Sequence, residues 1–167
     1  MTDEDYVSYV HARATALRRA AYLLSGDEHQ ADDLVQETIT KLYARWNRLN
    51  GVENLDAYVH SIMVRLFLDE KRRGWWKVRL GALPERPASP GAGVEPDERA
   101  AVREALSRVP ARQQAVLVLR FLCDQPVADV ARVMKCSEGT VKSQTAHGLA
   151  ALRRILGDRV HALGSMR

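Results

Sequence analysis

Hydrophobic residues recur at intervals of three and four along most of this chain, which is the spacing of helices that are apolar on one side. The spacing predicts a first helix over residues 6–24, closed by Ser25-Gly26-Asp27, a second over about 28–49, and a third over about 54–73. We find no alternating pattern that predicts a strand. The apolar stripes of the three helices match, so we expect them to form one small three-helix bundle.

The helical pattern stops between residues 74 and 96, where Gly, Pro, Ala and Ser dominate, and this composition predicts a flexible linker. Apolar helical spacing returns near Asp97 and continues to Leu156. We therefore predict an all-α protein of two small helical domains. The first is the three-helix bundle of residues 1–73, and the second is a four-helix domain of residues 97–167.

The last two predicted helices have the features of a helix-turn-helix. Residues 127–134 form a short amphipathic helix, and Lys135-Cys136 makes a tight polar turn. Ser137 is a good N-cap for the next helix, and Glu138 places negative charge at its positive end. Donors and acceptors suited to phosphates and base edges follow on its outer side. They are Thr140, Lys142, Ser143 and Gln144.

Charge is distributed unevenly along the 167 residues, although the net formal charge is only +4. Residues 1–73 carry 10 Lys and Arg against 12 Asp and Glu, whereas residues 97–167 carry 12 against 7. The second domain therefore has the charge of a polyanion binder. Cys123 and Cys136 lack the spacing of a zinc site, so we expect reduced thiols in the cytoplasm. No signal peptide or membrane segment is predicted, so we expect no membrane insertion.

Two surfaces of the first domain each have two interpretations. The outer side of the second helix carries Asp33, Gln36, Glu37 and Lys41, which form either a solvated face or a charged docking surface. The third helix ends in a basic strip followed by Trp75 and Trp76. These rings either stack on unpaired bases or close the end of the bundle.

Three segments together resemble a known family. They are ADDLVQETITKLYARW at 31–46, LDAYVHSIMVRLFLDEKRR at 55–73, and the pair of motifs within 105–153 that includes the helix-turn-helix. In this order and spacing they resemble the extracytoplasmic-function (ECF, group 4) sigma factors of bacterial RNA polymerase, of the actinobacterial type, within the sigma-70 family. The resemblance covers nearly all of the chain outside the linker. It implies that the first domain is region 2 and the second is region 4.

The resemblance also implies a function, which is to confer promoter specificity on RNA polymerase and start transcription of a stress or developmental regulon. The implied partners are the clamp helices of the largest polymerase subunit, the flap of the beta subunit, promoter DNA and an anti-sigma factor. No catalytic residue, cofactor or metal is implied. The residues implied for polymerase binding are Asp33, Gln36, Glu37 and Lys41; those for the minus-10 element are Asn54, Tyr58, Arg65, Arg72 and Arg73; those for the minus-35 element are Ser137, Glu138, Thr140, Lys142, Ser143 and Gln144.

Three positions depart from what is common in the family. Asn is frequent where Arg65 stands, Gly where Lys135 stands, and Arg or Lys where Gln144 stands. A non-glycine residue in a left-handed turn costs about 1 kcal/mol. Arg65 therefore contacts either a base or a phosphate. At Gln144 either one phosphate contact is missing or a base contact is changed.

Two other classes of protein compete with this interpretation. A stand-alone helix-turn-helix regulator with a helical sensor domain would bind its operator tightly without polymerase. A small helical hydrolase or diphosphate enzyme would need a converging site, but the five histidines are dispersed along the chain.

Overall fold

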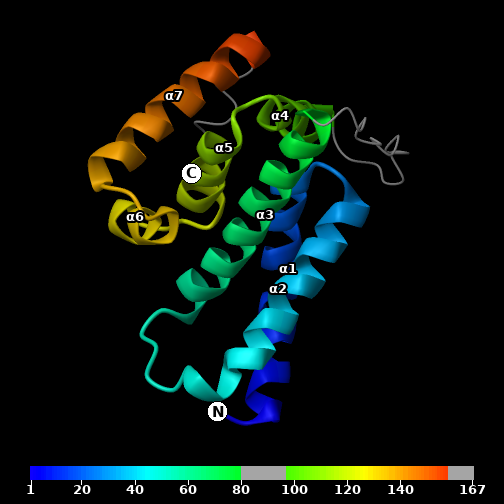
Figure 1. Ribbon diagram of the computed structural model, residues 1–167, viewed down its shortest axis with the longest axis vertical. Coiled ribbons are helices and arrows are strands. Elements are labelled where there is room, and N and C mark those ends of the chain that lie inside the picture. The colour runs from blue at the N-terminus through cyan, green and yellow to red at the C-terminus, as the bar shows by residue number, and fades with distance from the viewer. Residues whose placement is uncertain (80–96, 158–167) are drawn as a thin grey trace.

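The computed structural model describes residues 1–79 and 97–157, and within these ranges all regular structure is helical (Figure 1). The all-α prediction and the predicted order of the helices are therefore confirmed. The N-terminal module consists of α1 (Asp3–Ser25), α2 (Glu28–Arg45), the 3-10 turn η1 (Trp46–Arg48) and α3 (Leu55–Arg79). The C-terminal module consists of α4 (Asp97–Ser107), α5 (Ala111–Leu117), the π-helical segment η2 (Val118–Leu122), α6 (Val127–Met134) and α7 (Glu138–Leu156).

The first helix begins three residues earlier than the apolar spacing predicts. The Thr2 hydroxyl accepts a hydrogen bond from the Asp5 amide at 3.1 Å, and the Asp5 carboxylate accepts one from the Thr2 amide at 2.8 Å. This reciprocal capping box satisfies donors that the helix itself leaves unpaired. The Asp5 carboxyl has a lowered pKa because the Thr2 amide and hydroxyl stabilise its ionised form. A cap thus extends the helix beyond its apolar stripe.

The N-terminal module has a core built from all three helices. α2 is capped by Asp27, whose carboxylate accepts from the His29 and Gln30 amides. The helix is followed directly by η1, in which Trp46 is buried. The Trp46 indole packs edge-on against Tyr6 and donates to the Thr2 carbonyl at 2.9 Å. The buried apolar side chains of this module are Leu17, Ala20, Ala21, Leu24, Ala31, Leu34, Val35, Leu42, Trp46, Leu49, Val59, Ile62, Met63, Val64 and Phe67.

Helix α3 extends to Arg79, so the predicted end at Arg73 is wrong by six residues. Gly74 follows Arg73 and costs only about 1 kcal/mol relative to alanine inside a helix, which is too little to end one. The predicted linker of residues 74–96 therefore starts with helical backbone. Its remainder, residues 80–96, lies outside the described residues, as do residues 158–167 and the side chains of Trp75 and Trp76.

The C-terminal module is held together by a close crossing of α5 and α7. A side chain at Gly148 would bring its first carbon within 2.9 Å of a Leu117 methyl group, so the missing side chain lets these helices approach. Both cysteines are half-buried free thiols. Burial raises the pKa of the Cys123 thiol to about 12, because a thiolate would lose its hydration there.

The two modules contact one another along the middle of the molecule. α5 and α6 pack against α3, while α4 and η2 pack against α1. Figure 1 shows α5 and α6 beside α3. One continuous cluster of buried apolar side chains runs from Leu17 in α1 to Val141 in α7. The spacing of apolar residues predicts the core within each module, but it does not predict that the two cores join in one apolar cluster.

Candidate DNA and polymerase interfaces

The turn between α6 and α7 has the geometry that its sequence predicts. Lys135 adopts a left-handed conformation, with φ of 53° and ψ of 50°, and the Cys136 amide donates to the Ala131 carbonyl at 3.0 Å. The Ser137 hydroxyl then accepts from the Thr140 amide at 3.0 Å and caps α7. The predicted helix-turn-helix and its N-cap are confirmed, and the turn fixes the direction in which α7 leaves the module.

Helix α7 presents one polar side to solvent over its first three turns. Val141 and Gly148 face the module and are buried, whereas Lys142 and Ser143 point away from it. Of the six side chains predicted for minus-35 recognition, five are exposed: Ser137, Glu138, Thr140, Lys142 and Ser143. The sixth, Gln144, is half-buried, and its Oε1 atom is buried.

Arg112, which lies outside the helix-turn-helix, also supports this turn. The Arg112 guanidinium of α5 donates to the Met134 carbonyl, the last residue of α6, at 3.1 Å. The carbonyls at a helix end lack partners within the helix, and a cation there also favours the helix dipole. Arg112 therefore connects α5 to the position of α7. Its sequence context gives no sign of this contact, because Met134 lies 22 residues away.

Replacing Ser137 with alanine should lower the free energy of unfolding by about 1 kcal/mol, because the Thr140 amide loses its acceptor. Urea-induced unfolding followed by circular dichroism measures this change. Ser143→Ala is the control, since Ser143 is also an exposed serine but lies in the second turn of α7. Equal stability of the two variants would contradict the capping role.

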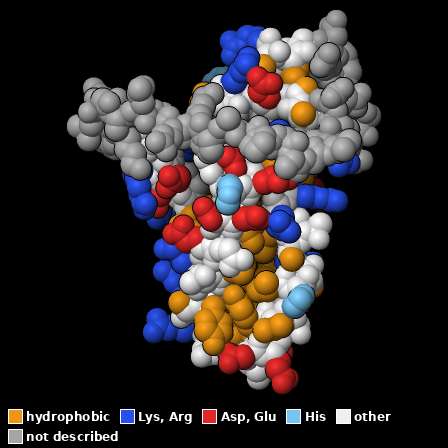
Figure 2. All heavy atoms as spheres, turned by 90° about the vertical axis from the view of Figure 1, so that its right-hand side faces the viewer, with side chains coloured by type: hydrophobic (Ala, Val, Ile, Leu, Met, Phe, Trp, Pro, Cys, Tyr) orange, Lys and Arg blue, Asp and Glu red, His pale blue; other side chains and the backbone are white. Residues whose placement is uncertain are grey.

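The outer side of α2 is an exposed charged face. Asp33, Gln36, Glu37 and Lys41 are all solvent-exposed, and Asp32 beside them pairs with Arg18 of α1 at 3.0 Å. Figure 2 shows hydrophobic side chains gathered low on the side of the molecule formed by α1 and α2. Apolar surface therefore lies close to this charged face on the same module.

Three of the five residues predicted for the minus-10 element lie along one side of α3, and a fourth, Asn54, directly precedes this helix. Tyr58, Arg65 and Arg72 are each seven residues apart, so they face within about 40° of one another at 100° per residue, and Asn54 lies at the start of the same row. At about 1.5 Å per residue the row is roughly 27 Å long. Arg73 is exposed on a different side, near the described end of this module.

Several side chains of this row already have partners within the protein. Asn54 Oδ1 accepts from the Ala57 amide at 3.0 Å, and the Tyr58 hydroxyl accepts from Arg45 of α2 at 3.3 Å. Arg72 pairs with Asp69 at 2.7 Å in an exposed position. Ser61, which the sequence places on the same strip, is buried and donates to the Tyr58 carbonyl at 2.6 Å. The accessible basic part of the strip therefore begins at Arg65.

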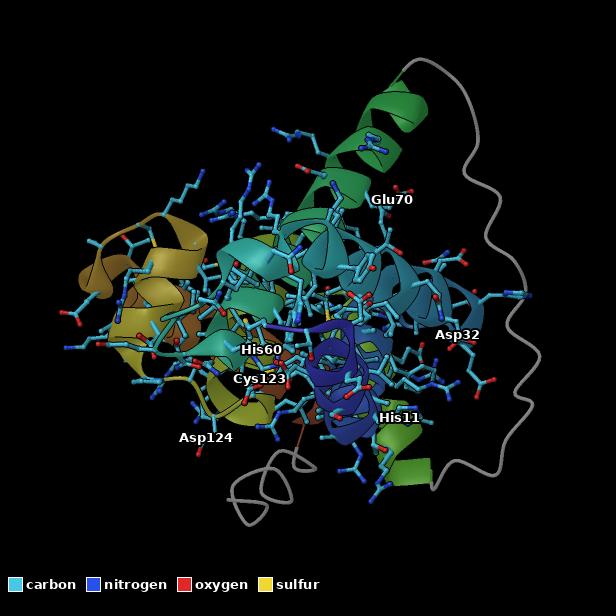
Figure 3. The ribbon with its side chains drawn as sticks, turned by 90° about the horizontal axis from the view of Figure 1, so that it is seen from below. His11, Asp32, His60, Glu70, Cys123 and Asp124 are labelled. Carbon is cyan, nitrogen blue, oxygen red and sulfur yellow. The ribbon has the colours of Figure 1, made fainter. Side chains whose placement is uncertain are left out.

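The four histidines within the described ranges are His11, His29, His60 and His147, and they form no shared metal-binding group. His11 is exposed on α1, whereas His60 on α3 is half-buried beside Cys123 and Gln125 (Figure 3). Burial lowers the pKa of the His60 imidazole, because its charged form would lose hydration. Within residues 1–79 and 97–157, no three His, Cys, Asp or Glu side chains gather so that they could hold a metal ion. None of the helices described for this chain is both long and apolar enough to cross a membrane.

Comparison with known protein families matches both modules. Residues 9–77 match the model of sigma-70 region 2, and residues 99–152 match that of sigma-70 region 4. The two matches occur in chain order on the two helical modules. They define the class of protein as sigma factors of the sigma-70 type, and the second match includes the helix-turn-helix with the exposed polar side of α7.

Two sigma factors that are similar in sequence identify the family within this class. The chain is 31% identical over 158 residues to the RNA polymerase sigma-E factor of Streptomyces coelicolor, covering 91% of this chain and 86% of that protein. It is 30% identical over 149 residues to the ECF RNA polymerase sigma factor SigM of Mycobacterium tuberculosis, covering 84% and 71%. The chain belongs to the ECF family of RNA polymerase sigma factors.

A solved structure shares the fold of both modules. The sigma factor RpoE of Bartonella quintana, determined in complex with the anti-sigma factor NepR, superposes with a TM-score of 0.74 at 25% identity. The match covers 93% of this chain and 98% of that one, so it includes the N-terminal and the C-terminal module.

Proposed function

We propose that this sigma factor works in the cytoplasm, directs core RNA polymerase to its promoters and has no catalytic step of its own. In this proposal residues 1–73, continued by α3 to Arg79, act as the region 2 module, and residues 97–167 act as the region 4 module. The observation that carries the proposal is the exposed polar side of α7, held in a fixed direction by the Ser137 cap. A helix in this arrangement suits the major groove.

The C-terminal module reads the minus-35 element in this proposal. Lys142 and the hydroxyls of Thr140 and Ser143 are the right size to meet phosphates and base edges. Glu138 accepts from a cytosine amino group, which a carboxylate can do in the major groove. Gln144 lies at the edge of this contact, since half of its side chain is covered by the module.

The row along α3 binds the minus-10 element. Arg65 and Arg72 neutralise phosphates, and Tyr58 offers a ring on which an unpaired base stacks. Asn54 at the helix start and Arg73 at its far end extend the contact. Binding energy gained from captured bases offsets the pairing and stacking lost when the strands separate, without ATP.

The charged face of α2 binds the polymerase core in this proposal, through the clamp helices of the largest subunit. Asp33, Gln36, Glu37 and Lys41 set the orientation, and apolar side chains at its margin supply burial. The C-terminal module contacts the flap of the beta subunit. An anti-sigma factor is a further proposed partner, because RpoE of Bartonella quintana was determined with one.

Run-off transcription tests the proposed function directly. DNA fragments selected from a random pool by the chain and core polymerase together should yield discrete transcripts only when both proteins are present. A stand-alone regulator would instead shift the same DNA without core polymerase. Folded protein that never supports a specific transcript would contradict the proposal.

Reversing the charges at Glu37 and Lys41 together should weaken binding to core polymerase by about tenfold or more, because both residues lie on the proposed docking face. Biolayer interferometry with immobilised core polymerase measures the change. The control is Glu104→Lys with Arg108→Glu, an exposed pair with the same four-residue spacing on α4. Equal affinities of the two double variants would exclude the α2 face.

A further inference from the structure

His147 lies on the exposed side of α7 that carries the proposed minus-35 contacts. Thr140, Ser143 and His147 follow one another at steps of three and four residues, so they face within about 60° of one another at 100° per residue. All three side chains are exposed, and Figure 1 shows α7 at the outer edge of the C-terminal module. His147 therefore continues the row of polar side chains that begins at Thr140.

The neighbours of His147 on this side of the helix are small. Ala146 and Ala150 are exposed, and their methyl groups are too short to cover an imidazole ring. Gly148, on the buried side of α7, lies against Leu117 of α5. Within residues 1–79 and 97–157, no hydrogen bond, ion pair or ring contact involves His147. The imidazole thus faces solvent with no partner in this part of the chain.

The helices that pack against α7 offer His147 no carboxylate partner. They are α4, α5 and α6. The charged side chains described on or directly after these helices are Arg99, Arg103, Glu104, Arg108, Arg112, Asp129 and Arg132. Glu104 pairs with Arg108, and Asp129 pairs with Arg132. Glu138, the one carboxylate of α7, lies nine residues before His147, about 14 Å away at 1.5 Å per residue. An anion that pairs with His147 therefore comes from outside the described chain.

The position of His147 along α7 matches the depth of a major groove. His147 lies seven residues after Thr140, which is about 10 Å at 1.5 Å per residue. The major groove is about 8.5 Å deep, and a recognition helix meets base edges with its N-terminal residues. When the first turn of α7 reaches the bases, His147 therefore lies at the rim of the groove, where the phosphates are.

We propose that His147 is a further promoter contact of α7, and that its protonated imidazole binds a phosphate at the rim of the major groove. A protonated imidazole donates from both ring nitrogens, and a hydrogen bond between two charged groups is about twice as strong as one between neutral groups. Histidine changes its charge between pH 5 and 8. Since phosphate favours the charged form, promoter affinity rises at low pH and falls as the pH increases. This inference rests on the proposed function.

His147→Gln tests the contact, because glutamine is polar but cannot take up a proton. The affinity of the complex with core polymerase is measured by fluorescence anisotropy, with labelled promoter DNA selected from the random pool. Wild-type affinity should exceed that of His147→Gln by about fivefold at pH 6 and should nearly equal it at pH 8. Comparing the two proteins at each pH cancels the pH dependence of the polymerase itself.

The salt dependence separates a phosphate contact from a structural role. At pH 6 the slope of log affinity against log salt should be steeper for the wild type than for His147→Gln by up to about 0.9, because one more phosphate is neutralised. At pH 8 the two slopes should agree. His147→Arg carries its charge at both pH values, so it should bind about fivefold more tightly than the wild type at pH 8.

Arg154→His is the matched control. It places a second histidine seven residues after His147 on the same side of α7, another 10 Å or so from the bases, where no phosphate is expected. Its response to pH should therefore equal that of the wild type. Far-ultraviolet circular dichroism at both pH values reports whether each variant is folded. A larger pH response of Arg154→His would assign the effect to net charge and overturn the contact at His147.

The outcomes also separate this inference from the proposed function. Normal promoter binding at pH 8, with equal affinities and equal salt slopes of wild type and His147→Gln at pH 6, would overturn the role of His147 alone. His147→Arg that binds no better than the wild type at pH 8 would overturn it as well. A folded chain that binds no promoter with core polymerase at either pH would contradict the proposed function, and the inference with it.

Discussion

Trp46→Ala should lower the free energy of unfolding by about 3–5 kcal/mol, which is a large part of the total stability of a domain of this size. Trp46 is 2% exposed, and its ring centroid lies 5.4 Å from that of Tyr6 and 5.9 Å from that of Tyr9. The indole nitrogen also donates to the Thr2 carbonyl. Removing this side chain leaves a cavity between α1 and α2 and frees the start of α1. Thermal unfolding should show a midpoint lower by roughly 10 °C.

Trp46→Phe separates the two parts of this effect. The smaller ring keeps much of the packing with Tyr6 but leaves the Thr2 carbonyl without its indole donor. We expect a loss of about 1–2 kcal/mol, between that of the wild type and that of the alanine variant. A loss as large as that of Trp46→Ala would assign the stabilisation to the hydrogen bond rather than to burial. Unchanged stability of Trp46→Ala would contradict the packing seen here.

Lys142→Glu should reduce the affinity of the polymerase complex for its promoter by at least about tenfold, because a negative charge replaces a positive one beside the phosphates. Lys142 is exposed on the second turn of α7, away from the buried side at Val141. Fluorescence anisotropy with labelled promoter DNA measures the affinity. The slope of log affinity against log salt should also become shallower by about one unit.

Arg154→Glu is the matched control on the same helix. It makes the same change in charge on an exposed side chain 12 residues further along, about 18 Å away at 1.5 Å per residue. We expect promoter affinity close to that of the wild type. If Arg154→Glu weakens binding as strongly as Lys142→Glu, the effect comes from net charge, and the proposed position of α7 in the major groove is wrong.

The helix-turn-helix could be predicted from the sequence because its determinants are local. The Ser137 cap, the turn at Lys135 and the apolar spacing of α6 all act within a few residues of one another, and each has the predicted form in the structure. The outer face of α2 was predictable for the same reason, since the positions opposite a buried stripe are fixed by helical geometry. The family resemblance rests on these same segments.

The ends of the helices were harder to predict than their apolar sides. Capping residues can extend a helix beyond its apolar stripe, and a single glycine can be too weak to end one. Thr2 and Asp5 start α1 before its apolar stripe begins, and the pairing of their side chains is readable from the sequence once a capping box is sought. Gly74 fails to stop α3 because its cost is small. Gln144 is half-buried rather than fully outward because it lies beside the buried side of α7.

The sequence by itself determined the helical elements, the apolar stripe of each and the exposed polar side of α7, since these depend on residues close together in the chain. The tertiary structure alone decided that Ser61 and Val64 are buried, that Arg112 braces the turn and that Gln114 caps α1. The hydrogen bonds of Arg112 and Gln114 join residues 22 to 91 positions apart in the chain. The spacing of apolar residues shows which side of a helix packs in its own bundle. It does not show which distant side chain donates a hydrogen bond to a carbonyl at the end of a helix.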